Sequence, residues 1–97
     1  DTMRVKFRTT SHLAQAAGLS ELEVELECCT VRDVLRTVVD HDEVNEEFKR
    51  LVFPSEDRVS DVINILLNGK NIRYMDGLDT EVQDGDKVSV MPMHCAG

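Results

Sequence analysis

The chain has 97 residues and a mass of 11.0 kDa, enough for one hydrophobic core, so we expect a single domain over 1–97. Aspartate and glutamate total 19 against 11 lysines and arginines, a formal net charge of −8. This balance argues against nucleic acid and against an anionic membrane as partners, because both are bound through basic surfaces. It favours steering toward a basic partner. Neither a spanning helix nor a signal-peptide pattern is predicted.

Alternating apolar and charged residues over 3–9 predict a half-buried strand. Residues 10–20 are small and polar and predict a loop or one helical turn, anchored by Leu13. Alternation over 21–27 predicts a second strand in a hairpin with the first, so that the basic residues of 3–9 face the glutamates of 21–27.

Two helices are predicted next. A capping-box pattern at Thr30 and Asp33 opens a helix over 30–41. A shorter amphipathic stretch over 43–53 ends at Pro54.

The second half of the chain predicts strands and turns. We expect a central strand over 62–67, a type I′ turn at Asn68-Gly69, a short strand over 70–74, single turns at 77–80 and 84–86, a strand over 87–91 and a mobile extended tail over 92–97. The element order predicts an α+β fold with β-grasp topology: a mixed sheet of four to five strands, covered by one main helix, with the last strand parallel to the first. Phe7, Leu35, Ile65 and Val90 should share its core.

The residues for independent enzyme chemistry are sparse. The acidic residues are interpreted as solvated faces, because nothing buries one carboxyl group of a pair. His12, in the predicted loop, and His41, at a helix end, are interpreted as structural. The three cysteines, Cys28, Cys29 and Cys95, are an odd count with two adjacent, which predicts free thiols in a reducing, cytoplasmic setting. Together with His94 they match no zinc spacing, so neither metal nor cofactor is expected.

Residues 66–97 resemble the C-terminal third of the MoaD/ThiS sulfur-carrier family. The features in common are Asn68-Gly69, Gly77-Leu78-Asp79-Thr80, the Asp84-Gly85-Asp86 turn, the Val-x-Val strand, Pro92 and the final glycine. The strand at Val5–Phe7, Leu13, Gly18 and the segment Thr30–Leu35 are also similar. The family ends in Gly-Gly, whereas this sequence ends in Ala96-Gly97; either a final glycine is missing or the penultimate one is replaced by alanine.

The resemblance implies a ubiquitin-like carrier whose terminal glycine, here Gly97, is activated by an adenylating enzyme related to ubiquitin-activating enzymes. A sulfur donor then converts it to a thiocarboxylate. In the MoaD branch the carrier is the small subunit of molybdopterin synthase, and the large subunit uses its sulfur. Thiamine or cysteine biosynthesis, a ubiquitin-like modifier joined to target lysines, and a non-catalytic binding module are the alternatives.

The expected partner-binding residues lie on the sheet face near the tail and in the tail itself. Arg8 and Met91 alternate outward from their core neighbours Phe7 and Val90. The tail contributes Pro92, Met93 and Ala96.

Overall fold

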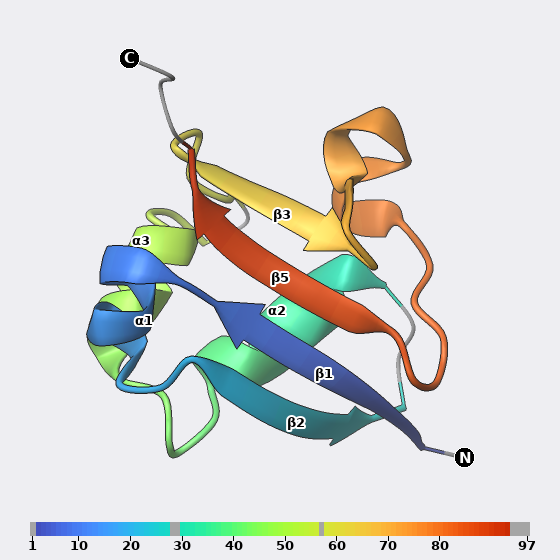
Figure 1. Cartoon of the computed structure of the whole chain (residues 1–97), viewed down its shortest axis with the longest axis horizontal. Helices are drawn as coiled ribbons and strands as arrows, with labels where there is room; N and C mark the ends of the chain where they lie inside the picture. The colour runs from blue at the N-terminus through green and yellow to red at the C-terminus, as the bar shows by residue number, and fades with distance from the viewer. Residues whose placement is uncertain (1, 28–29, 57, 94–97) are drawn as a thin grey trace.

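A computed structural model of the chain describes residues 2–27, 30–56 and 58–93. Its five-stranded sheet has the order β2-β1-β5-β3-β4 (Figure 1). The strands are β1 (Met3–Thr9), β2 (Glu21–Leu26), β3 (Ile63–Leu67), β4 (Lys70–Asn71) and β5 (Lys87–Pro92). β5 runs parallel to β1 and antiparallel to β3, and the remaining pairs are antiparallel. The β-grasp topology predicted from the element order is therefore confirmed.

The hairpin of β1 and β2 has the register that the alternating pattern predicts. Arg4, Lys6 and Arg8 lie opposite Glu25, Glu23 and Glu21. Among these three pairs, Arg4 and Glu25 form an ion pair of 3.1 Å, and both side chains are exposed. Exposed pairs contribute about 0–1 kcal/mol, so the burial of alternate residues is the stronger determinant of the register.

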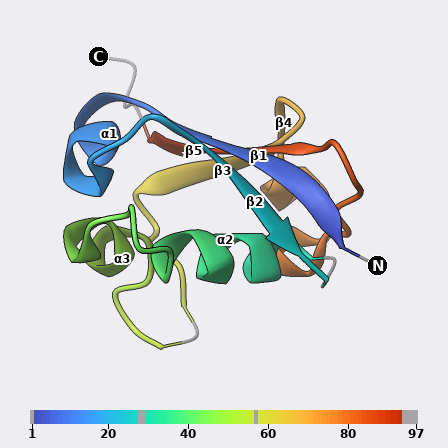
Figure 2. The ribbon, with the colours of Figure 1, turned by 90° about the horizontal axis from the view of Figure 1, so that it is seen from below.

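Helices cover one face of the sheet. Figure 2 shows α2 (Val31–Val39) and α3 (Glu46–Val52) below the sheet, while α1 (Ser11–Ala17) lies at one end of it. α2 ends two residues before the predicted 41, at the Asp40 cap. α1 corrects the predicted loop or single turn: its seven residues bury Leu13, Ala16 and Ala17, and Gly18 ends it in the left-handed conformation.

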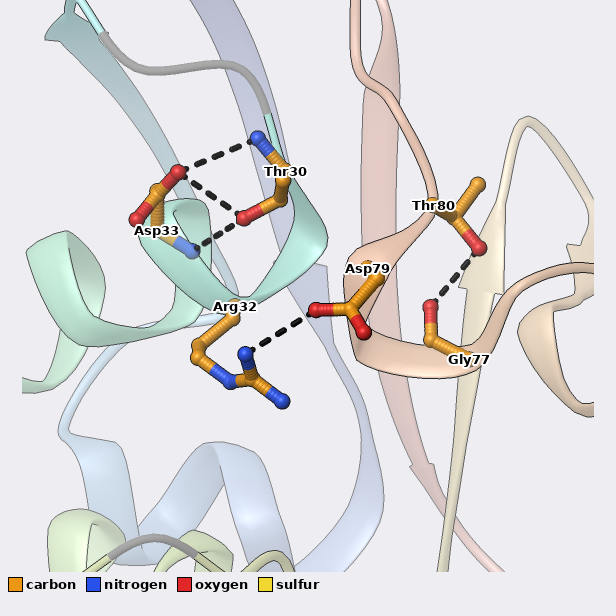
Figure 3. Close-up of polar contacts among 6 residues, drawn as sticks. All are labelled: Thr30, Arg32, Asp33, Gly77, Asp79 and Thr80. Carbon is orange, nitrogen blue, oxygen red and sulfur yellow. Dashed lines mark hydrogen bonds and ion pairs between the residues drawn. The ribbon is translucent and has the colours of Figure 1, made fainter.

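The start of α2 is fixed by its own cap and by a distant turn (Figure 3). Thr30 Oγ1 accepts a hydrogen bond from the Asp33 amide, and Asp33 Oδ2 accepts one from the Thr30 amide, which completes the predicted capping box. Arg32 pairs with Asp79 of the second 3₁₀ turn (Gly77–Asp79) at 3.0 Å. The Val31 amide donates to the carbonyl oxygen of Thr80.

A single hydrophobic cluster, mostly aliphatic, fills the space between the sheet and the helices. Phe7, Leu35, Ile65 and Val90 are all buried in it, as predicted. Phe7 and Phe48 meet edge to face, with ring centroids 5.7 Å apart. This contact packs the sheet against α3, which lies within the amphipathic stretch predicted over 43–53.

Two details of the second half differ from the prediction. The strand expected over 70–74 is only Lys70–Asn71, because a 3₁₀ turn (Ile72–Tyr74) follows and buries Ile72. Pro92, assigned to the tail, is the last residue of β5. The Asn68-Gly69 turn has positive φ at both residues, as a type I′ turn requires.

Candidate functional site

β5 carries the outer face of the sheet toward the C-terminus. Val88 and Val90 point into the core and have no exposed surface. Lys87, Ser89 and Met91 alternate with them on the face opposite α2. Since β5 leads directly into the tail, a protein bound on this outer face also has the tail within reach.

A shallow groove on this face contains both of the predicted docking residues on the sheet. Arg8 on β1 lies opposite Ser89 on β5, and Leu66 on β3 lies opposite Ser89 from the other side. Arg8 is exposed, and Leu66 and Met91 are half-buried. The groove is lined by Arg8, Leu66, Asn68, Gly69, Lys87, Ser89 and Met91. Leu66 and Met91 give this groove apolar surface, and Arg8 and Lys87 add cationic side chains.

The base of the tail is fixed to the sheet. Pro92 pairs with Ile63 and is buried, so its ring faces the protein itself. The Met93 amide donates a 2.9 Å hydrogen bond to the Val62 carbonyl oxygen. The mobile tail predicted over 92–97 is therefore wrong for these first two residues. Exposed Met93 and Val62, which is 70% exposed, give the tail base an apolar surface.

Several predicted residues lie outside the described part of the chain. These include Ala96 and Gly97, the proposed end of the tail, and the cysteine and histidine candidates Cys28, Cys29, His94 and Cys95. In the ranges 2–27, 30–56 and 58–93, no group of three or more metal-binding side chains is found. His41 has a local role: its Nδ1 accepts a hydrogen bond from the Glu43 amide. His12 lies on α1 and is exposed.

The sequence predicted Lys6 on the outward face of the first strand but did not assign it to the docking surface, and it did not single out Leu66 or Lys87 for that face. Lys6 and Lys87 line a second depression together with Arg8, next to the first. The alternation of each strand already indicates that these side chains point outward. Only the parallel register shows that they form one surface, because it places Lys6 beside Lys87 and Arg8 beside Ser89.

No helix among the described residues is long and apolar enough to cross a membrane.

The sheet order, the parallel β1–β5 pair and the helix across one face define a ubiquitin-like β-grasp protein. More particularly, the chain belongs to the ThiS family, whose model matches residues 10–97.

Three similar proteins come from archaea. A protein of Archaeoglobus fulgidus with the provisional name of a sulfur carrier protein is 30% identical over 98% of this chain and 100% of its own length. The solution structure of small archaeal modifier protein 1 from Methanosarcina acetivorans has a TM-score of 0.82 and 32% identity, covering 100% of this chain and 99% of that one. A Pyrococcus furiosus structure, provisionally named molybdopterin converting factor subunit 1, has a TM-score of 0.72 and 34% identity, covering 95% and 99%. The chain is thus similar to both sulfur carriers and ubiquitin-like modifiers.

Proposed function

We propose that the protein is a sulfur carrier whose C-terminal glycine, Gly97, is activated by an adenylating enzyme and converted to a thiocarboxylate. The observation that carries the proposal is the geometry of β5: its outer residues line a groove, and its last residue leads into the tail. Membership of the ThiS family and the Archaeoglobus relative support it.

The chemistry needs little from this chain beyond a reachable carboxylate. A carboxylate oxygen of Gly97 attacks the α-phosphorus of ATP, and pyrophosphate leaves. The resulting acyl adenylate is an activated electrophile, whereas the free carboxylate is not. A sulfur nucleophile then attacks the acyl carbon and AMP departs. The enzyme supplies these groups, and the carrier supplies the glycine together with the surface that docks it.

For the pathway, we propose molybdopterin synthesis, with this chain as the small subunit of a synthase and a large subunit as the second partner. The resemblance to the Pyrococcus protein supports this pathway. Both partners would use the same groove in turn, and flexible Met91 suits a surface that must fit two proteins.

Intact-mass measurement tests the carrier proposal. The protein is incubated with the adenylating enzyme of its source organism, ATP and a sulfide donor. Replacement of one carboxyl oxygen by sulfur adds about 16 Da to the chain. A second form, extended by one glycine after Gly97, shows whether the Ala96-Gly97 end limits the reaction. No mass gain in either form would exclude the carrier function.

A modifier function is the second candidate, favoured by the similarity to small archaeal modifier protein 1. Activation is shared by both functions, and only the acceptor of the acyl group differs: sulfur in one, a lysine amine in the other. Digests of cell extract separate them. A modifier leaves an isopeptide-linked remnant of the tail on target lysines, and a dedicated carrier leaves none.

A further inference from the structure

The outer face of the sheet gathers three cations that lack ion-pair partners in the described part of the chain. They are Lys6 and Arg8 on β1 and Lys87 on β5, all exposed and all lining one depression, whose far side is formed by Glu21 and Glu23 of β2. Ion pairs of the described residues engage other cations: Arg4, Arg32, Lys49 and Arg50. A protein of net charge −8 therefore presents locally positive groups beside its tail-bearing strand.

Two of these cations stand directly opposite each other. Lys6 and Lys87 are paired positions of the parallel strands β1 and β5. Like charges opposite each other on one sheet face are destabilising. Glu23 lies on the other side of Lys6 in the register, yet it forms no ion pair with it. An arrangement that opposes folding is expected where the surface serves binding.

We propose that this face recognises an acidic protein surface: the docking partner presents aspartate or glutamate carboxylates to Lys6, Arg8 and Lys87, around an apolar contact with Leu66 and Met91. The choice of the adenylating enzyme as that partner rests on the proposed function. The sign is opposite to the one that net charge predicts, because a docking partner meets the local field within about 10 Å and not the sum over the molecule.

The neighbouring strand argues for a compact carboxylate patch and against a nucleic acid. β2 places Glu21, Glu23 and Glu25 on the same face, beside the cations. A phosphate backbone crossing the sheet would meet this acidic row, and its affinity requires many cations in succession. The groove toward β3 contains Arg8 and Lys87 and has no carboxylate among its lining residues, so a protein patch seated there meets these two cations away from the row and also contacts Leu66 and Met91.

Stopped-flow association with the adenylating enzyme of the source organism tests the surface. The variants are Arg8→Glu and Lys87→Glu. The control is Arg50→Glu on α3, an exposed position that changes the net charge by the same amount. At low salt we expect each groove variant to slow association by about tenfold or more. The control should stay within about twofold of wild type, since charge away from the interface contributes little to steering.

Thermal unfolding of Lys87→Glu separates docking from folding. The new carboxylate faces Lys6 across the strands, so the variant should unfold at a higher temperature than wild type although it docks more slowly. A lysine with a purely structural role would give lower stability instead. Equal association rates for Lys87→Glu and Arg50→Glu would overturn the proposal, and so would displacement of the enzyme from wild type by a single-stranded RNA oligonucleotide.

Intact mass measured on the same mixtures keeps the two proposals separate. If wild type gains mass and the groove variants associate at the wild-type rate, the docking proposal is wrong and the carrier proposal stands. If the groove variants associate more slowly and wild type gains no mass, the docking proposal stands and the carrier proposal is wrong. No association of wild type with the enzyme at all would overturn the surface as stated.

Discussion

The amide of Met93 donates a 2.9 Å hydrogen bond to the carbonyl oxygen of Val62, which extends the β3–β5 register beyond Pro92. The sheet thereby holds the chain through Met93, and Gly97 is four residues further along the sequence. A fully extended chain spans at most about 3.3–3.6 Å per residue, so Gly97 can lie no more than roughly 14 Å from Met93. For the proposed activation of Gly97, the adenylating centre of a docked enzyme has to lie within that distance of Met93.

Tail length should therefore limit activation. Deletion of His94 shortens the reach by roughly 3.5 Å and should reduce adenylation at least about tenfold, because misplacement by an ångström already costs much of the rate. The His94→Ala variant keeps the length and serves as the control. Adenylation is followed as ATP–pyrophosphate exchange. A deletion variant as active as His94→Ala would show that tail length does not limit adenylation.

The apolar face of α2 packs on the sheet, so truncating a buried side chain on that face should strongly lower the free energy of unfolding. Leu35 is 0% exposed, and Leu35→Ala should lower the free energy of unfolding by about 2–5 kcal/mol. Leu51 on α3 is 37% exposed, and Leu51→Ala should cost less than about 1 kcal/mol. Urea unfolding measures both. Similar costs at the two positions would contradict the burial that the fold assigns to them.

The capping box at the start of α2 predicts a smaller, local effect. Thr30→Ala leaves the Asp33 amide without its side-chain partner and should cost about 0.5–2 kcal/mol in urea unfolding. Thr37 lies on the same helix and its hydroxyl donates to the Asp33 carbonyl oxygen. Thr37→Ala should be close to neutral, because alanine favours the helix interior. Equal losses for both variants would remove the special role of the cap.

Gly18 predicts a backbone requirement at the end of α1. Its φ is +83°, and a Cβ there would lie 2.7 Å from Asn45 Nδ2. Gly85 has φ +89° and open space around the same position, so Gly85→Ala carries the backbone strain alone. Gly18→Ala should lower the free energy of unfolding by about 1–2 kcal/mol through backbone strain at positive φ, and further through the clash with Asn45. Gly85→Ala should show the backbone strain alone. Calorimetry that ranked Gly85→Ala as the more harmful would contradict this.

Much of the fold could be predicted because burial alternates along the strands. The β1 pattern required Phe7 inside and Arg8 outside, and both are so placed. α1 was missed because alanines carry little hydrophobic signal, although Leu13, Ala16 and Ala17 have helical spacing. The early end of β4 depends on Asn71, whose side chain accepts from the Arg73 amide and starts the 3₁₀ turn.

The sequence predicts which residues of each strand point outward, but it does not predict which outward residues of different strands lie side by side. Arg8 and Met91 follow from alternation, whereas the approach of Lys87 to Lys6 needs the parallel register. The net charge of −8 predicts a basic partner, but a sum over the chain carries no information about where unpaired cations gather.

In both proposed functions, carrier and modifier, Gly97 is activated by adenylation. ATP–pyrophosphate exchange measures this step directly. The adenylating enzyme is given the full chain, the chain extended by one glycine, or the chain without Gly97. We predict exchange that depends on the full or extended chain and is lost without Gly97. Equal exchange with all three, or exchange with none, would contradict the account.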